Sequence, residues 1–177
     1  MDWSKLTDKR GDFGTTDNRK GKISKDDGRI FIIGKIDSLL VKLGKTEFLS
    51  NEENYPYFPF SLVRSHCRDF MAILMEYKSL KNGEKIISDV EHIYEYISDE
   101  MNRQEVPFPN HWVDYNMSLL SNYFDECSTI IREIEVSFIR EVDISFEKNQ
   151  VILQYFNRLS KIFYMHARMA DFFLKKQ

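Results

Sequence analysis

Apolar side chains recur every three or four residues over most of the chain, the spacing that places them on one face of an α-helix. In residues 28–43 this face holds Ile32, Ile36, Leu39, Leu40 and Leu43. Asp26 or Asp27 precedes the run, and either aspartate can cap the first turn of a helix. The same spacing predicts four further helices, over residues 60–80, 84–104, 111–141 and 147–175.

The prolines support these helix boundaries. Pro56 and Pro59 precede the second predicted helix, and Pro107 and Pro109 precede the fourth. Proline disrupts the interior of a helix but is tolerated near its ends. No stretch of alternating apolar and polar residues is long enough to predict a strand. We therefore expect an all-α protein, a five-helix bundle with an extended N-terminal loop.

The composition agrees with one folded domain. The 177 residues are 42% hydrophobic and 14% aromatic, which is enough for a sizeable core. We predict a single domain over residues 1–177, with the N-terminal loop in residues 1–28 and the helical bundle in residues 29–177. Cys67 and Cys127 are expected in the core, because two distant cysteines do not suggest a disulfide framework.

The charge of the chain and the lack of targeting signals indicate its partners and its cellular compartment. Lysine and arginine number 25 against 28 acidic residues, a net charge of −3, so we expect no nucleic acid partner. No apolar run reaches the length of a membrane span, and the first residues lack the apolar segment of a secretory signal. These features predict a cytoplasmic protein without a membrane partner.

Residues near the N-terminus combine groups that suit a phosphate. Glycines at Gly11 and Gly14 allow the backbone to approach an anion, and Thr15 and Thr16 supply hydroxyls. Positive charge comes from Lys9, Lys25 and Arg29. The segment is not a Walker A loop, because no Gly-Lys-Ser or Gly-Lys-Thr closes it. From these residues alone, a nucleoside triphosphate site and a solvated N-terminal arm both remain open.

Three blocks of sequence resemble one known family. They are Gly11-Asp12-Phe13-Gly14-Thr15-Thr16 with the following Ser24-Lys25-Asp26-Asp27-Gly28-Arg29, then Arg132-Glu133-Ile134-Glu135, and then Asn157-Arg158-Leu159-Ser160 continuing to Ala167-Arg168. In this order and spacing the blocks resemble the PduO-type ATP:cob(I)alamin adenosyltransferases. Residues 45–125 match only by their helical pattern.

The resemblance implies a function and a site. It implies transfer of the 5′-deoxyadenosyl group of ATP to cob(I)alamin, with Mg²⁺ and ATP bound between the subunits of a homotrimer. An adenosylcobalamin-dependent enzyme would accept the product. The implied ATP residues are Lys9, Gly11, Asp12, Gly14, Thr15, Thr16, Lys25, Arg132, Glu135 and Asn157. Arg132 and Asp37 are the implied catalytic residues.

The helical candidates Arg132, Glu135 and Asn157 can also be explained without a ligand. Arg132 and Glu135 share a helix face, so they could form a surface ion pair instead of a ligand site. Asn157 could be a polar residue satisfied at a helix interface. No metal site is predicted, because the four histidines show no ligand-like spacing.

Several positions depart from the family pattern. Ser128 stands where the family has an arginine that pairs with the aspartate at Asp37, which leaves Arg29, Lys35 or Lys42 as substitute partners. Lys22, Glu133 and Val136 replace arginines, and Pro109-Asn110-His111 replaces Pro-Gly-Gly. The aromatic residue that helps expel the lower ligand falls near Val106, with Phe108 close by. These departures leave a second hypothesis, a non-catalytic homologue that binds ATP or corrinoid for delivery or regulation. A third is a helical interaction protein.

Overall fold

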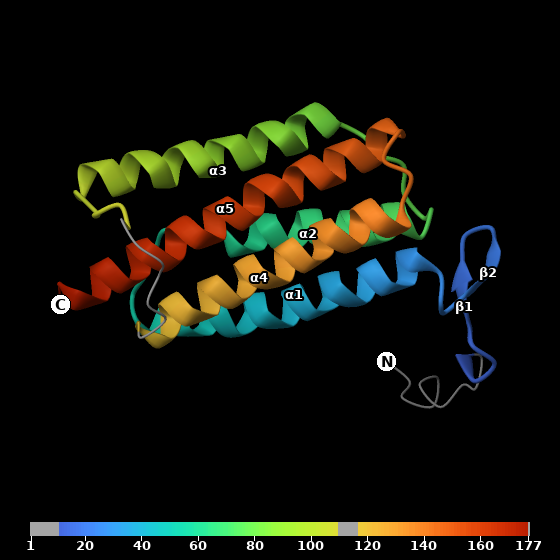
Figure 1. Cartoon of the computed structure of the whole chain (residues 1–177), viewed down its shortest axis with the longest axis horizontal. Coiled ribbons are helices and arrows are strands. Elements are labelled where there is room, and N and C mark those ends of the chain that lie inside the picture. The colour runs from blue at the N-terminus through green and yellow to red at the C-terminus, as the bar shows by residue number, and fades with distance from the viewer. Residues whose placement is uncertain (1–10, 110–116, 177) are drawn as a thin grey trace.

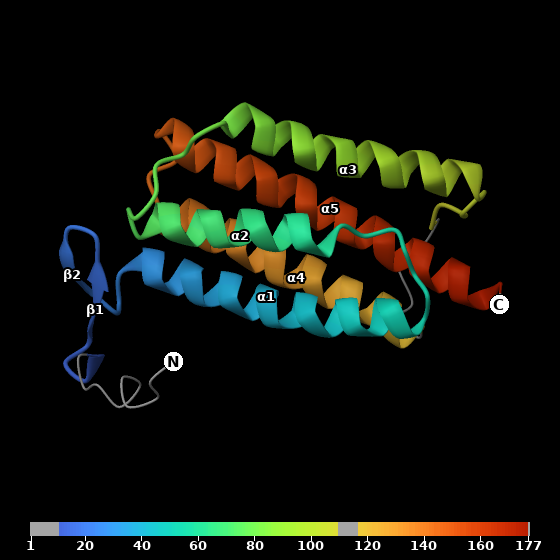
Figure 2. The same ribbon diagram turned by 180° about the vertical axis from the view of Figure 1, so that it is seen from behind.

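Five helices lie side by side in the computed structural model, which describes residues 11–109 and 117–176. The helices are α1 (Gly28–Glu52), α2 (Phe60–Leu74), α3 (Gly83–Arg103), α4 (Leu119–Glu141) and α5 (Glu147–Lys175). Helix α5 packs against α4 and α3, while α1 packs against α4 and α2 (Figures 1 and 2). The predicted all-α bundle is confirmed. None of the described helices combines the length and apolar character that a bilayer crossing requires.

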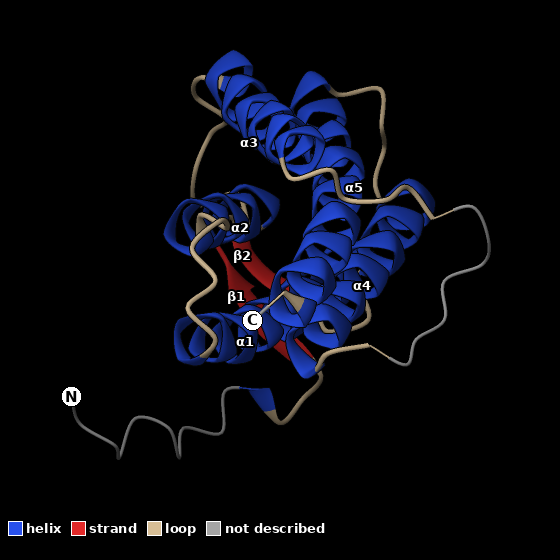
Figure 3. Ribbon diagram, turned by 90° about the vertical axis from the view of Figure 1, so that its left-hand side faces the viewer, coloured by secondary structure: helices blue, strands red, loops and turns tan. Residues whose placement is uncertain are grey.

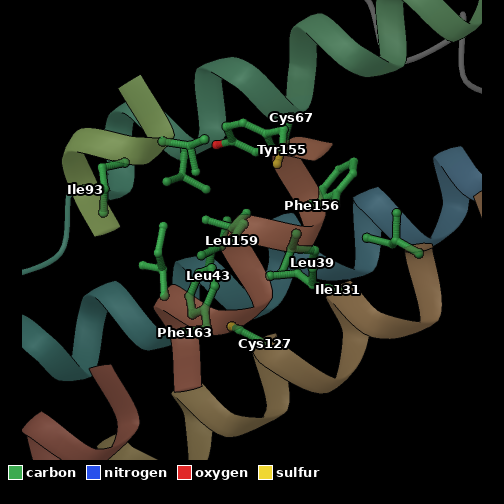
Figure 4. Packing of buried hydrophobic residues seen from close by; sticks show 14 of the residues in the cluster. Leu39, Leu43, Cys67, Ile93, Cys127, Ile131, Tyr155, Phe156, Leu159 and Phe163 are labelled. Atoms are coloured by element: carbon green, nitrogen blue, oxygen red, sulfur yellow. The ribbon is translucent and has the colours of Figure 1, made fainter. Parts of the chain in front are cut away.

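The core is aromatic and closely packed. Phe124 of α4 and Phe163 of α5 are fully buried, with ring centroids 6.0 Å apart. Tyr155 and Phe156 are fully buried on α5 (Figure 4). Burying one such side chain stabilises the fold by roughly 1.5–3 kcal/mol. Both cysteines are buried and unpaired, as predicted, and burial raises the pKa of each thiol to about 12. The core therefore contains thiols of low reactivity.

Helix α1 begins where the sequence predicts but continues further. Asp27 is the N-cap, and its Oδ1 accepts a hydrogen bond from the backbone N–H of Arg29 at 2.9 Å. The predicted end at Leu43 is wrong, because the helix runs to Glu52. Thr46 is accommodated inside the helix, where its hydroxyl donates to the carbonyl oxygen of Lys42 at 2.9 Å. The helix ends where Asn54 adopts a positive φ of 51°.

Two other predicted boundaries are also wrong. Helix α2 stops at Leu74, not near residue 80, because Glu76 adopts a left-handed conformation with φ of 60°. Helix α4 begins at Leu119, because the Ser118 side chain accepts a hydrogen bond from Ser121 N–H at 3.2 Å and so caps the helix. Residues 117 and 118 are not helical, so α4 is shorter than the predicted helix over residues 111–141, and residues 110–116 lie outside the described part.

A short β-hairpin precedes the bundle and was not predicted. Strand β1 (Thr15–Asn18) pairs in an antiparallel manner with β2 (Gly21–Ser24), and Thr15 faces Ser24. Gly21 has a φ of 132°, which favours glycine at the turn. The hairpin lies beyond the end of the bundle where α1 begins (Figures 1 and 3). Part of the expected extended loop is thus regular structure.

The cap of α1 provides a test of local structure. Replacing Asp27 by alanine should lower the free energy of unfolding by about 1 kcal/mol, because the first turn loses its side-chain acceptor. Urea unfolding followed by circular dichroism measures this loss. The matched control is Asp26→Ala, one residue earlier and exposed. Equal losses in the two variants would contradict the assignment of Asp27 as the cap.

Candidate functional site

Lys25 organises the N-terminal half of the predicted site. Its ammonium group donates to the carbonyl oxygen of Gly11 at 2.8 Å, and its backbone N–H donates to that of Gly14 at 2.8 Å. Gly14 has a φ of 69°, so a larger residue would be strained there. A Cβ at Gly11 would lie 2.9 Å from the Lys25 ammonium nitrogen. The two glycines and Lys25 therefore form one loop structure.

The remaining N-terminal candidates lie on or beside this loop. Thr15 and Thr16 are half-buried in β1, and Asp12 is exposed. Lys9 lies outside the described residues. Exposed backbone and hydroxyl groups beside a lysine form an arrangement that can bind phosphate oxygens.

Glu76 attaches the hairpin to the bundle. Its carboxylate lies 2.9 Å from the Lys20 ammonium nitrogen and 3.5 Å from Nη1 of Arg29. The Lys20 bond is the largest cause that holds the pKa of Glu76 below its usual value. Next to it, the Tyr77 hydroxyl donates to the carbonyl oxygen of Asp17 at 3.3 Å. Sequence reasoning missed Glu76, because its left-handed conformation has no glycine or asparagine to signal it.

The helical half of the site joins α4 and α5. The Asn157 amide donates to Oε1 of Glu135 at 3.0 Å. Arg132 lies one turn earlier on α4 and is exposed. Within the described residues no ion pair joins Arg132 to Glu135, so the glutamate orients the asparagine. The structure thus places these three predicted residues on one surface, where the Glu135 carboxylate accepts a hydrogen bond from Asn157.

Arg132 lines a cavity of about 450 Å³ between α3, α4 and α5. The segment after α3 contributes Val106, Phe108 and Pro109, and Phe108 is 83% exposed. The wall from α5 contains Lys161, Tyr164 and Arg168. These follow Asn157 at helical spacing, on one face of α5. That spacing was the signal that could have identified them in the sequence.

The two halves of the predicted site do not meet within one chain. Gly28, the first residue of α1, lies directly against the Glu141 side chain at the end of α4, with no space for a Cβ. Arg132 precedes Glu141 by nine residues, or about 14 Å along the helix. The hairpin extends away from the bundle beyond that end (Figure 2). The predicted loop residues and the predicted helical residues therefore lie apart within one chain.

The sequence of the chain matches a known family. A family model for cobalamin adenosyltransferases matches residues 6–170 of the chain. The chain belongs to the cobalamin adenosyltransferase family. The match covers the loop, α4 and the Asn157 region of α5.

Solved structures of such enzymes have the same fold. Three are variants of the PduO-type adenosyltransferase from Lactobacillus reuteri. A phenylalanine-to-histidine variant complexed with cobalamin and ATP has 26% identity and a TM-score of 0.74, covering 94% of this chain and 91% of that chain. A phenylalanine-to-alanine variant with the same ligands has 25% identity and a TM-score of 0.75, covering 94% and 93%. An arginine-to-lysine variant complexed with ATP has 23% identity and a TM-score of 0.73, covering 94% of each chain. A search of curated protein sequences found no match.

At position 128, where the resemblance predicts an arginine, this member of the adenosyltransferase family has a small buried residue. Ser128 is 3% exposed, and its hydroxyl donates to the carbonyl oxygen of Ser160 at 2.9 Å. The serine thus connects α4 to α5 inside the chain. Asp37 lies on α1 and is exposed. Within one chain the structure does not bring Asp37 to the other candidate site residues.

The three substitute partners considered for Asp37 are engaged elsewhere. Arg29 contacts Asp27 at 2.9 Å, Lys35 contacts Glu133 at 2.6 Å, and Lys42 pairs with Glu126. The Lys35 contact also gives the acidic residue at position 133 a positively charged neighbour on α1. Its charge is directed toward α1 and neutralised there.

The Asn157–Glu135 bond leads to a prediction for this family member. Replacing Asn157 by alanine should cost less than about 1 kcal/mol of stability, because the bond is solvent-exposed. The same change should weaken ATP binding by about tenfold, since a charge-oriented amide is lost from the site. Calorimetric titration with ATP measures the effect. The control is Gln154→Ala, which removes another exposed amide on α5 outside the three-helix cavity. Equal ATP affinities in the two variants would contradict the role of Asn157.

Proposed function

We propose that the protein transfers the 5′-deoxyadenosyl group of ATP to cob(I)alamin and releases triphosphate. The observation that carries this proposal is the group Arg132, Glu135 and Asn157, which lies beside a cavity of about 450 Å³ between three helices. The L. reuteri relatives bind ATP and cobalamin in the same fold. ATP is proposed to lie along Arg132 and Asn157, and the corrinoid in the cavity.

The reaction needs no nucleophile from the protein. The electron pair of Co(I) attacks the 5′ carbon of ATP, a cobalt–carbon bond forms, and the carbon–oxygen bond to the triphosphate breaks. The triphosphate leaves with the electron pair of that bond. The protein contributes orientation of the two substrates and stabilisation of the departing negative charge.

Particular residues are assigned to charge stabilisation and to substrate orientation. Lys25 and Arg132 stabilise the triphosphate, and the loop from Gly11 to Thr16 supplies backbone and hydroxyl donors. Glu135 orients the Asn157 amide toward the nucleotide. Phe108 is exposed at the cavity, where it would exclude water or a lower ligand from the cobalt.

Mg²⁺ would accompany the triphosphate. Among the described residues, no three histidine, cysteine, aspartate or glutamate side chains form a resident metal cluster. Magnesium commonly binds through substrate phosphates with few protein ligands, and the exposed carboxylate of Asp12 fits that mode. Bound Mg²⁺ would neutralise charge on the leaving group.

The site would be completed in a homotrimer, with the loop of one subunit against α4 and α5 of its neighbour. Two helices that pack together carry exposed apolar side chains available for such a contact, Phe31, Val41 and Phe48 on α1 and Val136 and Ile139 on α4. We expect light scattering to give three times the chain mass of 21.1 kDa. A monomer at micromolar concentration, with activity intact, would contradict this arrangement.

An anaerobic absorbance assay tests the transfer itself. Mixing the protein with reduced cobalamin and Mg-ATP should remove the cob(I)alamin band and produce a photolabile alkylcobalamin spectrum. Lys25→Ala should reduce the rate and the ATP affinity. Lys45→Ala, an exposed lysine on α1 with no assigned role, is the control. No turnover by the unaltered protein would reject the transferase function.

A non-catalytic homologue is the second candidate, and the serine at position 128 favours it. Such a protein would bind ATP or corrinoid for delivery or regulation without forming the cobalt–carbon bond. The same assay separates the two, because only the enzyme yields the alkylcobalamin spectrum. In either case we propose a cytoplasmic setting, and for the transferase we propose an adenosylcobalamin-dependent enzyme as the acceptor of the product.

A further inference from the structure

The cavity between α3, α4 and α5 has an excess of positive charge. Arg132, Lys161 and Arg168 line it, and its described lining contains no carboxylate. The other lining residues are neutral, Tyr94, Ser98, Met101, Asn102, Val106, Phe108, Pro109, Tyr164 and Met165. A neutral or cationic ligand alone would not require this arrangement.

Arg168 has a partner inside the protein. Its side chain is 8% exposed, pairs with Asp125, and lies over the Tyr164 ring with Cζ 4.8 Å from the ring centroid. The pair is held by α4 and α5, so the guanidinium forms a fixed part of the wall. Its charge is largely compensated by the neighbouring carboxylate.

Arg132 and Lys161 supply the excess positive charge of the cavity. Neither has an ion-pair partner among the described residues, and both side chains are exposed at the cavity. The proposed function assigns Arg132 to the triphosphate of ATP. Lys161 then remains as a cation that faces the corrinoid and has no assigned partner.

We infer that Lys161 binds the phosphodiester of the lower nucleotide loop and so selects complete corrinoids over those that lack this loop. This inference rests on the proposed function. A complete corrinoid carries one negative charge in that phosphodiester, outside the ring. The corresponding incomplete corrinoid, cobinamide, lacks the phosphodiester and is more positive by one charge, so the cavity disfavours it electrostatically.

The test compares equilibrium binding of cob(II)alamin and cob(II)inamide by ultrafiltration with Mg-ATP present. The unaltered protein should bind cob(II)alamin about fivefold more tightly, as expected for a partly solvated charged hydrogen bond. Lys161→Met should reduce this ratio to about one by weakening only the cobalamin complex. The control is Lys175→Met, which removes a lysine from the same helix outside the cavity, where it pairs with Asp171 at 2.6 Å. It should leave the ratio unchanged.

Several results would overturn the inference. Equal weakening of both corrinoids in Lys161→Met would indicate a packing role, and a raised KM for ATP alone would assign the lysine to the triphosphate. A preference that survives in Lys161→Met would come from the nucleotide base. Failure of the unaltered protein to adenosylate either corrinoid would count against the proposed function, whereas adenosylation of both with equal affinity would count against the role of Lys161 only.

Discussion

Replacing Arg132 by methionine should lower kcat/KM for adenosyl transfer by about 100- to 1000-fold, the effect of removing one donor that stabilises developing charge. The side chain is exposed on α4, lines the cavity, and lies one turn from the Glu135–Asn157 bond. Methionine retains the aliphatic part of the side chain but removes the positive charge. The core is untouched, so stability should change by less than about 0.5 kcal/mol.

Two further variants separate charge from geometry. Arg132→Lys should recover only part of the lost activity, because lysine keeps the charge but cannot form the paired bonds of a guanidinium. Arg140→Met, two turns later on the same helix and also exposed, controls for the loss of a positive charge. It should leave kcat/KM within about twofold. Comparable activity in Arg132→Met and Arg140→Met would contradict the assigned role of Arg132.

The fold was largely predictable because the helices bury regular apolar faces. Helix α5 has the predicted bounds, and Asp27 caps α1 as expected. The errors lie where single side chains decide a boundary. Glu76 takes a left-handed conformation that glycine or asparagine normally signals, and Ser118 caps α4 inside a segment with continuous helical spacing. Strands of four residues with one buried side chain, Ile23, carry too little pattern to predict a hairpin.

The candidate site was less predictable, because it depends on contacts between helices. The sequence resemblance identified Glu135 and Asn157 separately, but their hydrogen bond arises only when α4 and α5 pack. The same holds for the Lys35–Glu133 bond, which arises only when α1 and α4 pack. Local spacing defines a face of one helix and leaves open which face of another helix it meets.

Acid should destabilise the protein through His166, by about 1.4 kcal/mol for each pH unit below 6.5. This histidine is fully buried, and burial lowers its pKa to about 3. The Tyr55 hydroxyl lies 2.8 Å from Nδ1, and the rings of Phe58 and Phe124 pack against the imidazole. A neutral imidazole accepts the tyrosine hydrogen bond, whereas a protonated one cannot.

The sign and range of this effect follow from the two pKa values. Between pH 6.5 and about 3 the unfolded chain holds a proton that the folded protein excludes, so stability falls as the pH falls. Over that range the loss reaches about 4 to 5 kcal/mol, and above pH 7 His166 contributes no pH dependence. The lowered pKa of buried His66 acts in the same direction, while Asp27 and other carboxylates with lowered pKa add to the loss at lower pH.

Urea unfolding at pH 7.0, 6.0 and 5.0 isolates the contribution of His166. His166→Gln keeps an acceptor near the Tyr55 hydroxyl and removes the titrating group, so its stability should vary less with pH than that of the unaltered protein. The difference in slope should approach one proton between pH 6 and 5. His92→Gln, at an exposed position on α3, should retain the original slope. If the slope of His166→Gln instead equals that of the unaltered protein, His166 does not stay neutral in the folded core, and the acid sensitivity belongs to other groups.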